Sequence, residues 1–208
     1  NLAIPSACSV SELRHAPSAA LNIVTDFTAL ALAASMEERF GTPFVYFEKY
    51  LCPERIRQGY RDIARHLNLD LEAEVAELCT ELEALIAASK KVVAGKNFVY
   101  GNTPMLAFEL SSFLASLGME PLLIQARDLY GNDAAYIQEI LSQGHDPYVA
   151  RVANIAPLQA VYKELRPSLY IGHENPERLR EYGVAQVAFD AAAAKLGFAV
   201  PLTVLKTL

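Results

Sequence analysis

The sequence is poor in cysteine, and the few cysteines that it has are scattered. Cys8, Cys52 and Cys79 are the three cysteines of the 208 residues, and they lie far apart without a CxxC pair. An odd number of scattered cysteines does not build a disulfide framework, which favours a reducing, cytoplasmic location. Metal and iron–sulfur sites usually take three or four ligands with at least one close pair, so a cluster held by these cysteines is a weaker interpretation than ordinary thiols.

Basic clusters and long apolar runs are also lacking. The 18 lysines and arginines are outnumbered by 24 acids, for a net charge of −6, which argues against a nucleic-acid surface. No apolar run approaches the roughly 18 residues that span a membrane, and nothing in the given sequence resembles a signal peptide, since Asn1 opens onto structured-looking sequence without a basic region. Because the sequence starts without Met and in mid-pattern, we expect it to be a fragment of a longer protein.

Short apolar runs alternate with segments of helical periodicity along the whole chain. This alternation, with short connections, is typical of parallel sheets covered by helices on both faces. With 52% hydrophobic residues the chain can bury a large core. We therefore predict an α/β fold of two Rossmann-like domains with three α/β/α layers. The expected strands are the strand tail Leu2–Ile4, Ala20–Val24, Pro43–Phe47, Asn97–Tyr100, Pro121–Ile124, Tyr148–Val152, Ser168–Gly172 and Val184–Ala188.

A long amphipathic segment, Asp70–Lys91, interrupts this rhythm. Acids crowd its first turns and Lys90 and Lys91 close its last turn, as the helix dipole prefers. A helix of this length is too long for a simple crossover and suits a connector between two α/β halves. We place the boundary near residue 92, with a truncated first domain over 1–91 and a second over 92–208.

The second half opens with a complete strand–turn–helix–strand unit, Lys96–Ile124. Asn102 or Thr103 is expected to cap a helix that has Pro104 at its first position, where proline costs no hydrogen bond. Gly118 is expected to end that helix in the left-handed conformation. The turn after the strand is where an open α/β sheet normally presents ligand-binding groups.

Polar residues follow three of the expected strands at their carboxyl ends. Such loops gather at one edge of a parallel sheet, so we predict a ligand-binding cleft there. The alternative interpretation is that several of these residues only cap helices, each contributing about 1 kcal/mol. The candidate residues are Thr25, Asp26, Asn102, Thr103, His173, Glu174 and Asn175.

Within this set, His173 and Glu174 suggest proton transfer, because an imidazole beside a carboxylate on a glycine-led loop can donate a proton. Adjacent residues usually diverge, however, and a loop histidine is often simply solvated. The sequence contains no GxxxxGK[ST], GxGxxG, GxSxG or HExxH pattern. The catalytic residues are thus not identified by any self-contained motif.

Several motifs along the chain together resemble those of one known family. Gly95–Ile124 is similar to that family's β-type strand, Gly-Asp-Pro-Asp turn and helix that ends in Leu-Gly-x-Glu-Pro. Leu21–Val24 and Met36–Val45 resemble the family's middle domain, and Leu165–Leu179 and Val184–Asp190 resemble its last strands. The matches run in the family's order over nearly the whole chain, which therefore resembles the nitrogenase component 1 proteins.

The resemblance implies a subunit of three Rossmann-like domains, of which this chain would be the last two. The family includes the nitrogenase molybdenum–iron protein, scaffold proteins for its cofactor, and reductases of chlorophyll and nickel-tetrapyrrole biosynthesis. It implies a second component-1-like subunit as partner and electrons from an ATP-dependent iron–sulfur reductase. It also implies an iron–sulfur cluster in the full-length protein, with the ligating cysteines mainly in the missing first domain and none in this fragment.

The sequence departs from the family pattern at three places. Thr25-Asp26 stand where the catalytic α-type chain has a cofactor-ligating cysteine, and Phe189-Asp190 stand where that chain has a histidine ligand. Gly101-Asn102-Thr103-Pro104 replaces the acidic turn. We therefore expect an oxidoreductase fragment that acts on a small molecule or tetrapyrrole rather than dinitrogen, and that is inactive alone. The alternatives are a non-redox scaffold or binding module for metal-cofactor assembly, or a purely structural family member.

Overall fold

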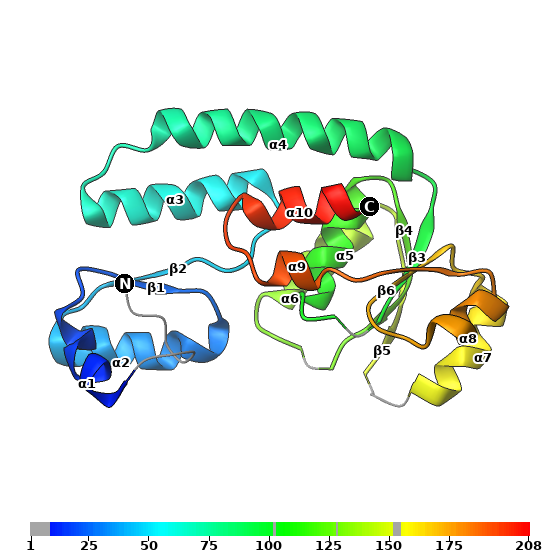
Figure 1. The fold of residues 1–208 in the computed structure, drawn as a ribbon, viewed down its shortest axis with the longest axis horizontal. Helices are drawn as coiled ribbons and strands as arrows, with labels where there is room; N and C mark the ends of the chain where they lie inside the picture. The colour runs from blue at the N-terminus through cyan, green and yellow to red at the C-terminus, as the bar shows by residue number, and fades with distance from the viewer. Residues whose placement is uncertain (1–8, 102, 128, 152–154) are drawn as a thin grey trace. The chain divides into compact units, whose positions relative to one another are not determined.

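The computed structural model describes residues 9–101, 103–127, 129–151 and 155–208, without the side chains of 155–159. The chain divides into two compact units, Asn1–Cys79 and Thr80–Leu208, so the division falls inside the long helix α4 (Glu72–Val93). The boundary predicted near residue 92 stays a prediction. The expected α/β class is confirmed, since parallel strands alternate with helices in both units (Figure 1).

The first unit contains a pair of parallel strands and the helices that follow them. Strands β1 (Asn22–Val24) and β2 (Phe44–Tyr46) pair with Ile23 opposite Val45. Gly41, at φ 71°, ends the helix between them in the left-handed conformation that glycine adopts readily. The helical elements are α1 (Val10–His15), η1 (Ala16–Ser18), η2 (Phe27–Ala29), α2 (Leu30–Phe40) and α3 (Pro53–Leu67).

The second unit is built on a five-stranded parallel sheet in the order β5-β4-β3-β6-β7. Because the chain runs outward from β3 to β5 and then returns to β6 beside β3, the sheet is doubly wound. The strands are β3 (Asn97–Tyr100), β4 (Glu120–Gln125), β5 (Tyr148–Ala150), β6 (Leu169–Ile171) and β7 (Ala185–Val187). The helices are α5 (Ala107–Ser116), α6 (Asp133–Ser142), α7 (Ile155–Leu165), α8 (Pro176–Glu181), α9 (Asp190–Ala193) and α10 (Ala199–Thr207).

Helices cover both faces of this sheet, with α5 and α6 on one side and α7 and α8 on the other (Figure 1). Side chains alternate between the two faces along each strand. On the α7 and α8 side, Val99, Leu123 and Tyr170 from neighbouring strands form one core cluster with Tyr162 and Leu179 from the helices. Three α/β/α layers therefore form, as the sequence predicts.

The start of α5 differs from the prediction. The helix begins at Ala107, with Leu106 as its N-cap and no side-chain cap, instead of beginning at Pro104. The Tyr100 hydroxyl donates a hydrogen bond to the Met105 carbonyl at 2.5 Å. Because this bond and the burial of Met105 hold the chain in an irregular path, the helix starts three residues later.

Candidate functional site

Two polar loops meet where the strand order of the second unit reverses, between β3 and β6. These strands pair in parallel with Tyr100 opposite Ile171, and the Gly101 N–H donates to the Ile171 carbonyl at 2.8 Å. The loops that begin at Gly101 and Gly172 therefore leave the same edge of one sheet, which confirms the predicted placement. In doubly wound sheets the ligand crevice lies at this reversal, beyond the carboxyl ends of the strands.

The β6 loop carries an imidazole–carboxylate pair that differs from the predicted one. The Nε2 of His173 lies 2.8 and 3.0 Å from the two carboxylate oxygens of Asp190, at the start of α9. With Nε2–H donating to the carboxylate, Nδ1 is the nitrogen that can exchange a proton with a ligand. Both side chains are more than half exposed, at 58% and 54%. The pair thus lies at the surface, beside the reversal point.

Asp190 is the residue that the candidate list lacks. The rule that polar residues after the carboxyl ends of strands are site candidates also selects Asp190. This residue closely follows the carboxyl end of β7, the strand beside β6. The separation of 17 residues from His173 hides the pairing in the sequence.

The side chain of Glu174 is buried, unlike that of its neighbour His173. Its side chain is 6% exposed, and Oε1 accepts a hydrogen bond from the Asn175 backbone N–H at 2.7 Å. The Gln186 amide of β7 donates to the carbonyls of Gly172, at 2.8 Å, and Glu174, at 3.2 Å. The Gln186 side chain therefore fixes the β6 loop. The expected divergence of adjacent residues separates the two members of the proposed pair.

The alternative interpretation, that the candidate residues only cap helices, holds for Asn175 and fails for Thr103. The Asn175 side chain accepts the Glu177 N–H at 2.9 Å and is the N-cap of α8, so capping accounts for it. Thr103 caps no helix, and its Oγ1 is buried with no hydrogen-bond partner among the described residues. Asn102 lies outside the described residues.

Thr25 and Asp26 belong to the sheet of the first unit, where they follow β1. Both are exposed, and Asp26 accepts hydrogen bonds from the Thr28 N–H at 2.9 Å and the Thr28 hydroxyl at 2.5 Å. The hydrogen bonds from Thr28 lower the pKa of Asp26. Asp26 is therefore the N-cap of η2, as its sequence position predicts, and a ligand-binding role for the two residues stays a prediction.

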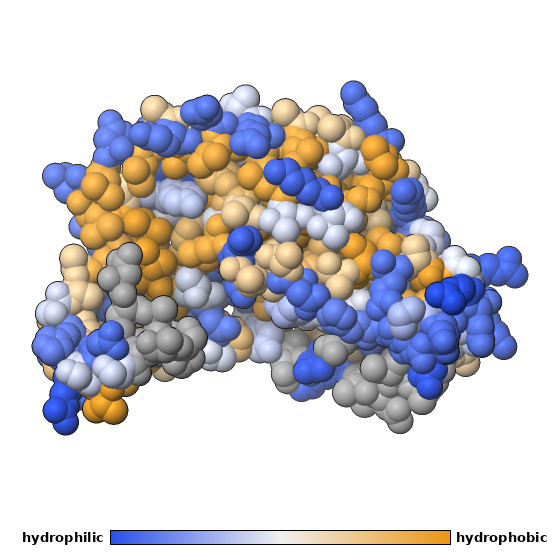
Figure 2. Space-filling view, viewed as in Figure 1, coloured by the Kyte–Doolittle hydropathy of each residue, from blue (hydrophilic) through white to orange (hydrophobic). Residues whose placement is uncertain are grey.

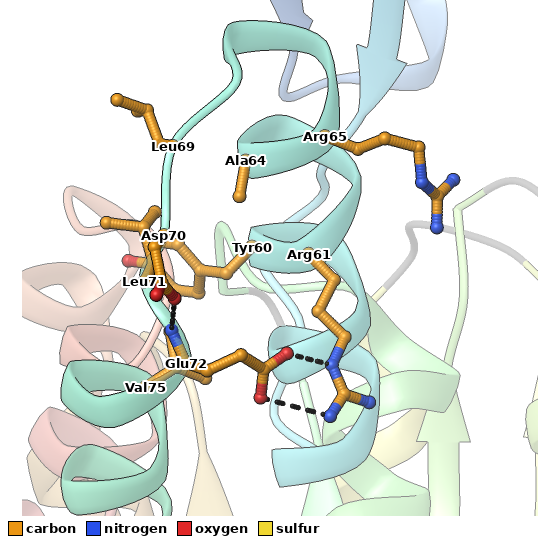
Figure 3. A pocket seen from close by; sticks show the side chains of 9 residues that line it. All are labelled: Tyr60, Arg61, Ala64, Arg65, Leu69, Asp70, Leu71, Glu72 and Val75. Carbon is orange, nitrogen blue, oxygen red and sulfur yellow. Dashed lines mark hydrogen bonds and ion pairs between the residues drawn. The ribbon is translucent and has the colours of Figure 1, made fainter.

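The first unit also has a hollow of about 290 Å³ that no sequence motif predicts. It lies between the end of α3 and the start of α4, and Figure 3 shows Arg61 directed onto Glu72 beside it. Arg61 Nε lies 2.6 Å from the Glu72 carboxylate, so its charge is already compensated. Leu67 and Leu69, at 37% and 52% exposed, make the turn apolar at the surface (Figure 2).

The described cysteines do not fit a cluster site. The Cys52 thiol donates to the Glu54 carboxylate at 2.8 Å, and burial raises the pKa of that thiol, which disfavours the thiolate that a metal needs. Within the described part of the chain, no three His, Cys, Asp or Glu side chains are grouped so that they could hold a metal ion. Cys8 lies outside that part. No described helix is long and apolar enough to cross a membrane.

Fold and site together define an α/β protein with a doubly wound parallel sheet and polar loops at its reversal point. The sequence profile described as Nitrogenase component 1 type Oxidoreductase matches residues 1–190. The chain belongs to that family.

Solved structures agree on the fold. A structure titled "Nitrogenase Cp1 at pH 6.5" superposes with a TM-score of 0.75 at 14% identity, covering 99% of this chain and 49% of that one. "Nitrogenase Cp1 at pH 5" gives a TM-score of 0.61 at 16% identity, covering 92% of this chain and 47% of that one. This chain thus spans about half the length of these proteins. No curated protein sequence matches it.

Proposed function

We propose that this chain forms part of an oxidoreductase subunit that takes electrons from an ATP-dependent iron–sulfur reductase. The family match over residues 1–190 carries the proposal. The subunit would pair with a second component-1-like chain in the cytoplasm and reduce a small molecule or a tetrapyrrole. The iron–sulfur cluster would be held outside the described residues, because Cys52 and Cys79 do not supply a ligand set.

Dinitrogen is not the substrate in this proposal. By the family resemblance, Thr25 and Asp26 stand where the catalytic chain has the cysteine that ligates its cofactor. Phe189 and Asp190 stand where that chain has the histidine ligand. The structure gives Asp26 and Asp190 other roles, a helix cap and a carboxylate partner for His173. Neither aspartate offers a soft ligand atom such as the cysteine sulfur, because a carboxylate binds metals through oxygen.

His173 is the residue that we expect to handle protons. Reduction of a small molecule consumes protons as well as electrons, and an imidazole held by a carboxylate can deliver them at neutral pH. Asp190 would fix the ring orientation through the Nε2 contact at 2.8 Å and leave Nδ1 toward the ligand. Gln186 would keep the loop in place.

Anaerobic expression of the full-length chain with its partner subunit tests this proposal. The complex is expected to show 4Fe–4S absorption and EPR signals that respond to the reductase and ATP. His173→Gln should lower turnover at least tenfold, since general acid–base catalysis contributes about 10²–10⁴-fold, while the EPR signal stays unchanged. His66→Gln, an exposed histidine on α3, is the matched control.

A full-length complex that never holds a cluster would contradict the redox role. The alternative would then be a non-redox scaffold or binding module for metal-cofactor assembly. In that case a tetrapyrrole, homocitrate or phosphate should raise the melting temperature of the cluster-free protein, because a ligand of the native state stabilises it. A cluster-loaded complex with full turnover in His173→Gln would leave the family role intact and remove His173 from it.

A further inference from the structure

The backbone on both sides of His173 is bonded to one side chain of the neighbouring strand β7. The Gln186 amide donates hydrogen bonds to the carbonyl of Gly172, at 2.8 Å, and to the carbonyl of Glu174, at 3.2 Å. These two carbonyls belong to the residues immediately before and after His173. One amide group therefore determines how far the residue that carries the imidazole lies from β7.

Gly172 has a backbone conformation that suits this arrangement. Its φ of 131° lies in the region that favours glycine, because a β-carbon would be strained there. Its N–H donates to the Val187 carbonyl at 2.8 Å, and its own carbonyl accepts from Gln186. The first residue of the β6 loop is thus bonded to β7 on both sides of its α-carbon.

The segment that follows β7 also supplies the carboxylate that contacts the ring. The two carboxylate oxygens of Asp190 lie 2.8 and 3.0 Å from Nε2 of His173. Phe189, which is 1% exposed, precedes Asp190 and anchors the start of α9 in the core. Because Asp190 is held by this buried neighbour, the ring meets the carboxylate when the β6 loop lies at the right distance from β7.

We propose that Gln186 is a positioning residue for His173, whose imidazole it places against Asp190. This role goes further than holding the loop, because the His173 side chain is 58% exposed and packing alone does not fix its ring. The role requires a donor, since both groups that the Gln186 amide meets are carbonyl oxygens, which only accept. The effect on turnover rests on the proposed function, in which His173 delivers protons, whereas the placement of the ring does not.

NMR signals of the histidine rings test the placement without any turnover, since the chain has four histidines. His173→Gln identifies the His173 signals by their loss, and Asp190→Ala shows where they lie without the carboxylate. Gln186→Met keeps the length of the side chain and removes its donor. It should move the signals at least half of the way from their wild-type position to their position in Asp190→Ala. Gln143→Met, the same change at an exposed residue, is the matched control and should leave them in place.

Gln186→Glu separates the donor from the volume of the side chain. Its carboxylate has nearly the same size but presents acceptor oxygens to the two carbonyls, so it should move the His173 signals at least as far as Gln186→Met does. It also replaces Gln186→Met if that variant does not fold. His173 signals that stay at their wild-type position in the Gln186 variants, or in Asp190→Ala, would overturn the proposal.

Turnover of the full-length complex measures the catalytic consequence. Gln186→Met should lower kcat about tenfold to a hundredfold and change KM less than about twofold, because a misplacement of about 1 Å can cost about 10²-fold. In the His173→Gln background the same change should lower kcat no further, since residues that act through one another are not additive. An equal drop in both backgrounds would overturn the proposal. A complex that holds no cluster would contradict the proposed redox function, and the ring signals would still decide the placement.

Discussion

At the scale of single residues, Gly101 makes the closest approach at the reversal point. A β-carbon built on it would lie 2.0 Å from the hydroxyl oxygen of Tyr170 and 2.2 Å from the ring carbon that bears it. Tyr170 is fully buried in the core cluster, so we expect its ring to resist displacement. Glycine is therefore required here by close packing and not by backbone conformation.

Gly101→Ala should lower the free energy of unfolding by about 1–3 kcal/mol, the usual range for overpacking a core. Gly131→Ala is the matched control, because nothing lies within 4 Å of its β-carbon position. Chemical denaturation of both variants measures the difference. A stability of Gly101→Ala equal to that of Gly131→Ala would show that Tyr170 can move and that the reversal point is loosely packed.

Residue-scale predictions from the sequence succeeded for local roles and failed for partners. The capping roles of Asp26 and Asn175 follow from a few neighbouring residues, and the structure has both. The partner of His173 depends on how β6 and β7 pair, which no local pattern encodes. Pairing of distant residues is set by the assembled sheet, so the contact of His173 with Asp190 appears only once the strand order is known.

At the scale of elements, the first helical turn after β1 depends on Asp26. This residue is the N-cap of η2, which leads directly into α2. Asp26→Ala should lower the free energy of unfolding of the first unit by about 0.5–2 kcal/mol, the usual cost of losing a cap. Asp26→Asn keeps an acceptor oxygen and should cost less at neutral pH. Thr25→Ala, at the exposed neighbour, is the control.

The acid dependence of stability separates the charge of Asp26 from its hydrogen bonds. The folded protein lowers the pKa of this carboxyl, chiefly through the Thr28 hydroxyl. Its contribution is therefore complete above the unfolded value of about 3.9 and is lost as the pH falls through the lower folded value. Asp26→Asn should show a flatter loss of stability in acid than the wild type, measured by urea unfolding at several pH values. Parallel curves would contradict this role.

Element boundaries show where sequence reasoning is limited. The end of α2 follows from a local signal, because this helix stops at Gly41, which takes the left-handed conformation. The start of α5 does not, because the bond from Tyr100 to Met105 competes with the helical signal of Thr103 and Pro104. The pairing of β3 with β4 shifts by one residue after Phe98, so that Val99 lies opposite Leu123 and not Leu122. Phe98 itself lies opposite Pro121, which has no N–H to donate.

At the scale of the whole molecule, the helix α4 belongs to both compact units. Residues from Thr80 onward group with the second unit, and the buried Leu82 and Val93 lie in this part of the helix. The boundary predicted near residue 92 instead assigns the whole helix to the first domain. The two assignments differ in which fragment should fold independently.

Two fragments decide between them. We expect the fragment 72–208, which keeps α4 whole, to melt about 10 °C above the fragment 95–208, because loss of buried apolar side chains such as Leu82 and Val93 costs about 2 kcal/mol each. Circular dichroism during heating gives both melting temperatures, and the sheet content at low temperature shows whether each fragment folds. Equal melting temperatures would support the boundary near residue 92. In that case α4 would act as a connector that the five-stranded sheet does not need for its own stability, and the reversal point with His173 could be studied on the short fragment alone.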